Sequence, residues 1–393
     1  MDTGYATRGT NPMRLSTRGL PANITEPVVG RIATTTPADP AESVLLADLR
    51  GFPPAALLGY RGLLTTAHHD DTLLQSTGVP LVHSIRDADH LHDGDIVVLD
   101  QQGGVRTLFR PASIHNTLFL TERCNSNCLM CSQPPKDHDD TKHFLAINEE
   151  LIRLIPLATS VLGITGGEPT LLREDLFTLI ALLKERLPNT HIHLLTNGRL
   201  FAWPEFAERF AAVGHPDLVL GIPLYSDAAT LHDYIVQARG AFDQTVTGLH
   251  HLARWQVPVE LRVVLHKLSI SRLHQLAEYI YRNLPFVVHV ALMGLEPTGY
   301  TPYHRDKLWL DPYEYQDHLA DAVDYLSLRG MHVSIYNLQR CVLPPSTWAY
   351  TRQSISDWKN IYLPECEGCA ERTSCAGFFQ SAERLHSSHI HAL

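Results

Sequence analysis

The chain has 393 residues, with 42 acidic and 32 basic side chains and a formal net charge of −10. This length exceeds what one ordinary hydrophobic core supports, so two or three domains are expected. The acidic balance argues against a nucleic-acid partner held mainly by charge, and no stretch approaches the roughly 18 consecutive apolar residues of a membrane span. The first 40 residues also lack the continuous apolar segment of a secretion signal. We therefore expect a cytoplasmic protein with no nucleic-acid and no membrane partner.

Residues 1–25 are expected to form a flexible arm, and residues 26–115 a β-rich N-terminal domain. The clearest element is a hairpin over residues 90–110, where two β-rich runs flank a turn that contains glycine. Residues 62–83 fit a helix that runs into a strand. The combined pattern resembles the swivelling β/β/α domain of phosphoenolpyruvate-utilising enzymes, in which a histidine lies near the position of His68. Because a fold does not carry a function, a small β-rich module that docks a partner or covers the next domain is the plainer interpretation.

Strands and helices alternate from residue 116 to residue 310, which predicts βα units and a mostly parallel sheet. Residues 173–187 repeat apolar side chains on one helical face and end before Pro188. The expected fold class is α/β, with a partial (β/α)6 barrel. In such barrels the chemistry lies at the C-terminal ends of the strands, so the loops that follow the strands are candidate site segments. Six apolar runs are the candidate strands: 117–120, 161–164, 191–195, 218–222, 259–265 and 287–293.

Three cysteines follow the first of these strands in a Cys-x3-Cys-x2-Cys run: Cys124, Cys128 and Cys131. Such short spacings indicate metal binding rather than disulfides, and seven cysteines, an odd number, fit a disulfide framework poorly. Structural zinc needs four ligands, and no fourth cysteine or histidine lies at zinc-finger spacing, whereas iron-sulfur clusters are held by cysteine thiolates. A cubane cluster held by three cysteines keeps one iron open for a substrate or cofactor.

This spacing resembles the cluster motif of the radical S-adenosylmethionine (SAM) superfamily. The resemblance implies a catalytic 4Fe-4S cluster, whose open iron chelates SAM and whose electron cleaves SAM to a 5'-deoxyadenosyl radical. The superfamily commonly has an aromatic residue before the last cysteine, and this chain has Met130. A polarisable thioether fills the same apolar place beside the adenine. An oxygen-sensitive cluster also agrees with a reducing compartment.

A Gly-Gly-Glu-Pro turn follows the second candidate strand and contains Gly166, Gly167 and Glu168. Two glycines let the backbone approach a ligand closely, and the glutamate supplies a carboxylate. Taken alone, such a segment is an ordinary turn signal. The radical SAM superfamily has its segment for the SAM amino group at this place, so the resemblance implies SAM contacts here.

Polar residues at the other strand ends complete the expected SAM site. The resemblance implies that Asn197 and Ser226 contact the SAM ribose and carboxylate, and that the backbone near Met293 contacts the adenine. Arg262 is a charged residue inside a buried strand, which demands a partner. The resemblance implies that Arg262 points toward the SAM carboxylate. The alternative is a rim residue paired with Glu260 or another acid.

Residues 311–393 are predicted to add a helix near 311–328, a strand at 332–336 and four further cysteines: Cys341, Cys366, Cys369 and Cys375. Four thiolates close a cubane completely. The spacing resembles the auxiliary-cluster extension of peptide-modifying radical SAM enzymes, which implies one auxiliary 4Fe-4S cluster, and a four-cysteine zinc site is the alternative. The histidine-rich end at 386–391 is expected to be a solvated tail.

Four segments together resemble one radical SAM subgroup, the maturase C protein of the His-Xaa-Ser repeat system: residues 116–136, 164–170, 293–299 and 354–359. The resemblance implies a maturase that acts with a second radical SAM protein as a heterodimer and needs an external electron donor. Its substrate would be a ribosomally made peptide with His-Xaa-Ser repeats, modified by oxidative crosslinking of His and Ser. Two alternatives remain open: a radical SAM enzyme acting on a small molecule, and a non-catalytic, cluster-binding subunit of a heteromeric maturase.

Overall fold

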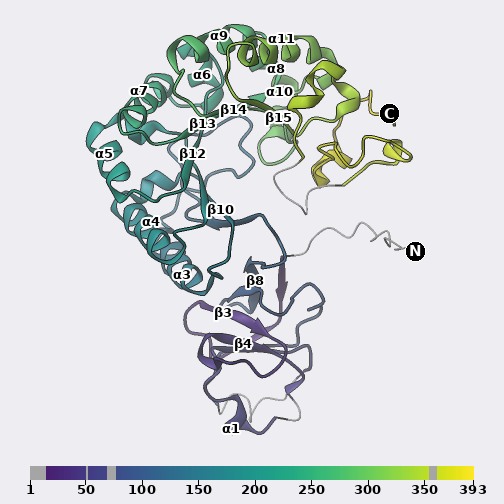
Figure 1. The fold of residues 1–393 in the computed structure, drawn as a ribbon. Helices are drawn as coiled ribbons and strands as arrows, with labels where there is room; N and C mark the ends of the chain where they lie inside the picture. The colour runs from purple at the N-terminus through teal and green to yellow at the C-terminus, as the bar shows by residue number, and fades with distance from the viewer. Residues whose placement is uncertain (1–14, 50–51, 69–76, 354–360) are drawn as a thin grey trace.

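The computed structural model describes residues 15–49, 52–68, 77–353 and 361–393. It confirms the α/β fold class, because the described chain forms a seven-stranded parallel sheet and an eight-stranded mixed sheet. Figure 1 shows the N-terminal sheet below one end of an arc, with helices along the outer edge of the arc and the C-terminal segment at its other end. Segment 354–359, one of the four that carry the subgroup resemblance, lies outside the described residues, as does the stretch 69–76.

The parallel sheet has the strand order β15-β14-β13-β12-β11-β10-β9. All six expected strands are present within two residues at each end. The strand expected at 332–336 in the C-terminal part also joins this sheet, because it pairs with β14 in parallel, so the sheet continues past residue 310. The strands are β9 (Asn116–Phe119), β10 (Val161–Thr165), β11 (His191–Leu195), β12 (Leu218–Pro223), β13 (Val259–Leu265), β14 (His289–Gly294) and β15 (Val333–Tyr336).

Helices cover one face of the parallel sheet, and β13 shows how the sequence places them. Its side chains alternate as a strand requires: Val259, Leu261 and Val263 are buried in the main core, while Glu260 and Arg262 face away from that core. The main helices are α3 (Thr141–Leu154), α4 (Glu174–Arg186), α5 (Pro204–Val213), α6 (Ala229–Val236), α7 (Ala241–Arg254), α9 (Leu273–Asn283) and α11 (Gln316–Ser327). Helices α3 and α6 were not predicted from the sequence.

The N-terminal sheet has the strand order β1-β8-β7-β3-β4-β5-β6-β2. The hairpin expected over 90–110 is confirmed as β7 paired antiparallel with β8. The eight strands are β1 (Ser16–Arg18), β2 (Leu20–Ala22), β3 (Val28–Ala33), β4 (Ser43–Leu46), β5 (Gly62–Leu64), β6 (Leu81–His83), β7 (Ile96–Leu99) and β8 (Gly104–Phe109).

Two expectations for this region are wrong. Residues 16–22 are not an arm, because β1 pairs with β8 and β2 pairs with β6. The chain from residue 62 does not begin a helix: β5 is a strand between β4 and β6. Its residues Leu63 and Leu64 are fully buried, so the strand lacks the polar alternation that marks a half-exposed strand in a sequence.

The N-terminal sheet packs on the barrel at the end of α3. Val29 and Phe109 belong to the same buried core as the barrel strands. Arg31 Nη2 donates a hydrogen bond to the Leu154 carbonyl at 2.7 Å. His68 is exposed, with Nδ1 2.9 Å from Ser84 Oγ; the swivelling-domain resemblance stays a prediction. The region thus packs against the barrel near α3, and its role as a cover or as a partner-docking module stays a prediction.

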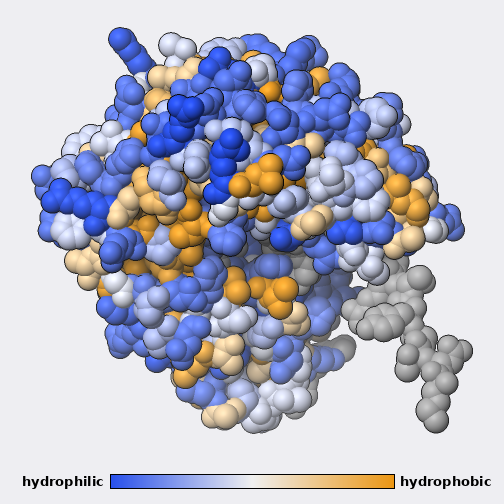
Figure 2. Space-filling view, turned by 45° about the horizontal axis from the view of Figure 1, so that its top comes forward, coloured by the Kyte–Doolittle hydropathy of each residue, from blue (hydrophilic) through white to orange (hydrophobic). Residues whose placement is uncertain are grey.

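Within the described ranges, no helix is both long enough and apolar enough to cross a membrane. Figure 2 shows a face that is mostly hydrophilic, with small hydrophobic groups scattered over it.

Candidate metal and cofactor site

The loop with the first three cysteines begins after β9, at the C-terminal edge of the parallel sheet. Within the loop, the Cys131 amide donates a hydrogen bond to the Cys128 carbonyl at 3.0 Å. Between these residues, the Leu129 amide donates to the Ile235 carbonyl in α6 at 2.9 Å. Helix α6, which the sequence did not reveal, therefore docks the cysteine loop from outside the motif.

The Gly-Gly-Glu segment after β10 is joined to the start of the cysteine loop. The Gly167 amide donates to the Thr121 carbonyl at 2.6 Å, and the Glu168 amide donates to the Arg123 carbonyl at 2.7 Å. A Cβ atom added at Gly167 would lie 2.0 Å from the Arg123 carbonyl oxygen, which no side chain allows. Glycine is therefore required here so that the cysteine loop can approach.

The Glu168 carboxylate is almost fully buried, at 1% exposure. Its Oε1 accepts from the Thr170 amide at 3.0 Å, from the Thr170 hydroxyl at 2.6 Å and from Thr196 Oγ1 at 2.5 Å, and its Oε2 accepts from the Asn197 amide at 2.7 Å. Burial raises its pKa, and these hydrogen bonds oppose that rise. The carboxylate joins the ends of β10 and β11, so its four donors leave little capacity for a ligand.

The loop after β11 also holds the cysteine loop. Asn197 Nδ2 donates to Asn125 Oδ1 at 2.6 Å. Arg199 donates to the Asn125 carbonyl and, at 3.0 Å, to Ser126 Oγ, while its Nε lies 2.7 Å from Gln244 Oε1. Arg199 is therefore a loop-positioning residue that the sequence analysis missed, because its partners lie far away in the chain.

Without a bound cation, the three thiols should stay protonated at neutral pH. Burial, with the neighbouring Glu168 charge, raises the pKa of Cys124 to about 12, while Arg199 opposes the rise. Burial also raises the pKa of Cys128 and of Cys131. Thiolate ligands form when a metal replaces their protons. Three such thiols on one docked loop fit an iron-sulfur cluster with one open iron.

An apolar cluster lies directly beside these cysteines. Met130 and Tyr225 are buried in it, and Cys128 packs against it. Burial, with the adjacent Cys128 and Cys131, raises the pKa of the Tyr225 phenol well above its ordinary value. Met130 thus lies in an apolar environment, and the cluster excludes water from one side of the thiols.

Two other expected SAM contacts lie at the ends of neighbouring strands. Ser226 is fully buried, and its Oγ accepts from the Ala228 amide at 3.1 Å, so the hydroxyl stabilises the turn into α6. Met293 is buried at the end of β14. SAM contacts stay predictions for these two residues and for the other expected ones: Met130, Gly166, Gly167, Glu168 and Asn197.

A charged network crosses the sheet face opposite the helices. Arg262 Nη1 lies 2.8 Å from Glu260 Oε1, so the predicted alternative pairing of Arg262 is present. His289 Nδ1 lies 2.7 Å from Glu260 Oε2, and His193 Nε2 lies 3.5 Å from Oε1. Burial opposes ionisation of Glu260, but the two histidines and Arg262 hold its pKa well below the ordinary range. His289 Nε2 reaches Ser334 Oγ at 3.0 Å, which ties the network to β15. Contact of Arg262 with SAM stays a prediction.

Residues 118–280 match the family model described as the radical SAM superfamily. This segment of the chain is thus similar to the radical SAM superfamily. It is 25% identical over 210 residues to GTP 3',8-cyclase of Petrotoga mobilis, covering 52% of this chain and 62% of that protein. It is 28% identical over 188 residues to the AdoMet-dependent heme synthase of Methanosarcina barkeri, covering 46% of this chain and 50% of that protein. The chain thus spans between half and two thirds of the length of these two relatives.

Among solved structures, the chain is similar to native anSMEcpe with bound AdoMet, at 14% identity and a TM-score of 0.49, covering 70% of this chain and 92% of that chain. The radical SAM domain match ends at residue 280, so it includes the first cysteine site and leaves the second site outside.

The second site lies in the segment that follows the matched residues 118–280 and β15. Four cysteines line one cavity there: Cys341, Cys366, Cys369 and Cys375. The Leu393 amide lies 3.4 Å from Cys369 Sγ, and the Ala370 amide donates to the Leu393 carbonyl at 2.8 Å. Burial raises the pKa of Cys341 and of Cys366. The sequence analysis grouped these four cysteines as one site, and in the structure all four line the same cavity.

The second site offers four thiols, the number that closes a 4Fe-4S cubane or surrounds one tetrahedral zinc ion. The auxiliary cluster and its zinc alternative both stay predictions. Elsewhere in the described residues, one trio of potential ligand atoms lies within 4.8 Å of one another: Glu122, His138 and Asp140.

The histidine-rich end is docked, so the expectation of a solvated tail is wrong. Ser387 Oγ donates to Asp311 Oδ1 at 2.6 Å, the His389 ring stacks on Tyr313 with centroids 4.0 Å apart, and Ile390 is buried in the main core. A terminal segment is ordered when it has such anchors. These anchors hold the chain end beside the four-cysteine cavity.

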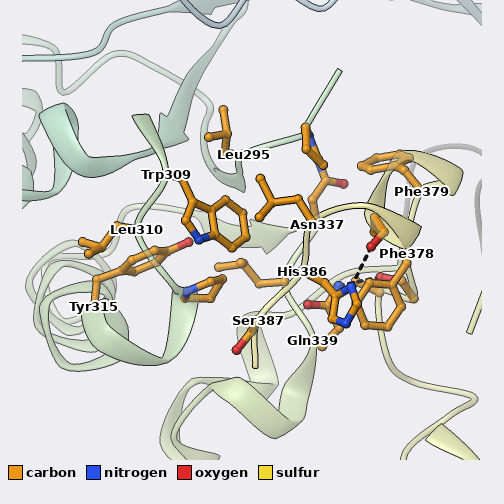
Figure 3. Close-up of a pocket in the computed structure, with 17 residues that line it drawn as sticks. Leu295, Trp309, Leu310, Tyr315, Asn337, Gln339, Phe378, Phe379, His386 and Ser387 are labelled. Atoms are coloured by element: carbon orange, nitrogen blue, oxygen red, sulfur yellow. Dashed lines mark hydrogen bonds between the residues drawn. The ribbon is translucent and has the colours of Figure 1, made fainter. Parts of the chain in front are cut away.

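A narrow cavity of about 40 Å³ lies between the segment that follows β14 and the C-terminal segment. Figure 3 shows its lining, with side chains from both sides facing one another: Leu295, Trp309, Tyr315, Asn337, Phe378, Phe379 and His386. Within the described chain, Asn337 Oδ1 is buried without a hydrogen-bond partner. The volume suits a few water molecules, one of which would satisfy this oxygen.

Proposed function

We propose that this chain is a radical SAM enzyme in which Cys124, Cys128 and Cys131 hold the catalytic cluster. The supporting observation is that these three half-buried thiols share one docked loop at the C-terminal edge of the parallel sheet, within the matched family segment. When bound, the cluster and SAM supply an electron and a 5'-deoxyadenosyl radical that removes a hydrogen atom. The protein positions the loop through Arg199 and excludes water through the cluster around Tyr225.

The test is SAM cleavage by anaerobically reconstituted protein under dithionite, assayed as 5'-deoxyadenosine. Formation above the level of protein without added iron is the expected result. Assays of this chain alone and with its partner separate an enzyme from a non-catalytic subunit. If only the partner's own cysteine variants lose activity, the non-catalytic alternative is correct.

We further propose a substrate: a ribosomally made peptide with His-Xaa-Ser repeats, modified together with a second radical SAM protein. The support is the subgroup resemblance together with the second cysteine cavity. Four protein thiols would occupy every iron of an auxiliary cluster and leave it unable to chelate a substrate. Linking His to Ser removes two hydrogens: one leaves as an atom to the 5'-deoxyadenosyl radical, and one leaves as a proton with an electron, for which the auxiliary cluster provides an acceptor.

Coexpression with the partner and the peptide tests this substrate. High-resolution mass spectrometry should show a loss of two hydrogens per modified repeat, with fragmentation suppressed inside that unit. An unchanged mass when both proteins cleave SAM would contradict the proposal, as would a change located outside His and Ser.

A small-molecule substrate is the second candidate, because two relatives are named GTP 3',8-cyclase and AdoMet-dependent heme synthase. For this candidate, SAM cleavage would be stimulated by a small-molecule extract and not by the peptide. Separate assays with each addition decide between the two substrates.

A further inference from the structure

A groove of about 790 Å³ lies directly against the loop that carries Cys131. We name it the rim groove. Its first wall is Ser132 and Gln133, its second is the segment 296–303 after β14, and its third is the segment 379–384 of the C-terminal region. This volume lies within the range of about 300–1,000 Å³ that ligand sites occupy. The rim groove is thus placed where a substrate would approach the first cysteine site.

The wall after β14 is fixed to the cysteine loop. The Tyr300 amide donates to the Cys131 carbonyl at 2.9 Å. Gly299 has a φ of +58°, and a Cβ atom there would lie 2.1 Å from the same carbonyl oxygen. Glycine is required for this approach and for this backbone conformation. The groove wall and Cys131 therefore keep a constant separation.

The C-terminal wall is also anchored. Gln339 Nε2 donates to the Gly377 carbonyl at 2.7 Å, and Phe378 is buried in the main core. Phe379 lines both the rim groove and the narrow cavity of Figure 3, and Gln339 lines both that cavity and the four-cysteine cavity. The rim groove therefore lies on the side of the C-terminal segment that faces the first cysteine site, with the second site behind it.

The side chains in the groove favour a cationic or imidazole-bearing ligand. Glu296 and Glu383 contribute carboxylates against one guanidinium from Arg384. The Tyr303 side chain is 83% exposed, an unusual exposure for an aromatic residue. Among the described residues, Ser381 Oγ is buried without a hydrogen-bond partner. A carboxylate and an aromatic face are the groups that bind an imidazolium, by a charge-assisted hydrogen bond and a cation–π contact.

The spacing of a His-Xaa-Ser unit suits such a groove. In an extended chain, side chains two residues apart project from the same face, about 7 Å from each other. An extended peptide in the rim groove would direct His and Ser to one wall and the intervening side chain away from it.

We propose that the rim groove binds an extended segment of the substrate peptide, and that Glu383 and Tyr303 recognise its histidine side chain. This inference rests on the proposed peptide substrate and adds where that substrate binds and which residues select it. The segment 379–384 would then serve recognition, while the cysteines on either side of it in the fold serve electron transfer.

The experiment compares Glu383→Gln and Tyr303→Ala with the wild-type chain, each in complex with the partner maturase. The probe is a fluorescent peptide of two His-Xaa-Ser repeats, titrated by anisotropy and then used as the substrate. We expect the dissociation constant and the KM for the peptide to rise about fivefold to tenfold, with little change in kcat. Glu208→Gln on α5 and Tyr281→Ala on α9 are matched controls on exposed outer helices, and these should bind the peptide like wild type.

A second peptide, in which each His is replaced by Gln, separates recognition from general damage. This peptide should bind wild type and Glu383→Gln with the same dissociation constant, because the interaction between the peptide histidine and the Glu383 carboxylate is already absent. If wild type modifies the His-containing peptide and both variants keep its KM, the groove assignment is wrong while the proposed function stands. If wild type cleaves SAM but neither binds nor modifies the peptide, the proposed peptide substrate itself is wrong.

Discussion

The two cysteine sites of the molecule are built in different ways. The first takes its three thiols from one short loop, and neighbouring strand ends clamp that loop through Glu168 and Arg199. The second takes Cys341 from one segment and its other three thiols from residues 366–375, and the end of the chain packs over them. The first site is therefore encoded locally and positioned by the sheet, whereas the second exists only when distant segments dock.

The largest expected effect is the loss of SAM cleavage when the first site alone is removed. Replacing Cys124, Cys128 and Cys131 with Ala should reduce 5'-deoxyadenosine formation under dithionite to background, because the open iron site is lost. Part of the bound iron should remain, held by the second site. Iron and 5'-deoxyadenosine are measured on the same preparation. A triple variant that still cleaves SAM would show that these cysteines do not hold the catalytic cluster.

Metal analysis tests the second site. Anaerobically reconstituted protein should carry about eight irons per chain if both sites are cubanes, and about four irons with one zinc if the C-terminal site is tetrahedral zinc. The resemblance of the C-terminal cysteine spacing to an auxiliary-cluster extension leads us to expect the iron result. The first-site triple variant provides the control, since its remaining metal reports the second site directly. One zinc and no iron in that variant would contradict the auxiliary cluster.

A third prediction concerns the clamp on the first site. Glu168→Ala removes the acceptor of four hydrogen bonds and leaves buried donors unpaired. The free energy of unfolding should therefore fall by about 3 kcal/mol. The matched control is Glu174→Ala, which removes an exposed ion pair with Arg209 and should cost less than about 1 kcal/mol. Thermal unfolding of both variants gives the comparison. Equal losses would mean that Glu168 is not a structural clamp.

The sequence predicted the parallel sheet well because each strand is an apolar run bounded by clear turns. It predicted the first cysteine site because all three ligands fall in one loop. It missed α6, a helix of only eight residues, and so missed the backbone that docks the cysteine loop. It missed Arg199, because nothing near this residue in the chain shows that it reaches Asn125.

The other errors have the same origin in long-range packing. The strand at 332–336 was recognised, but its pairing with β14 depends on the path of the chain. The glycines at 166–167 were expected to let the backbone approach a ligand, which stays a prediction; the sequence did not reveal that Gly167 also makes room for the Arg123 backbone. The histidine-rich end was expected to be solvated, because its anchor Asp311 lies more than seventy positions away.

The variant with the smallest expected effect tests whether the second site depends on the contact between the chain end and Asp311. Ser387→Ala removes a hydrogen bond to the Asp311 carboxylate, which should weaken docking of the chain end by about 1–2 kcal/mol. Ser388→Ala is the matched control, because its hydroxyl is exposed and 3.4 Å from the same carboxylate. Hydrogen exchange of residues 386–391 should rise in the first variant and not in the second.

In metal-free protein, alkylation of the C-terminal cysteines should accelerate in parallel with this exchange, because the docked end lies against Cys369. Alkylation of Cys124, Cys128 and Cys131 should stay at the wild-type rate, since their loop is held by the strand ends and α6. A uniform rise at all seven cysteines would mean that the two sites unfold together, and the distinction between a locally encoded site and a docked one would then fail.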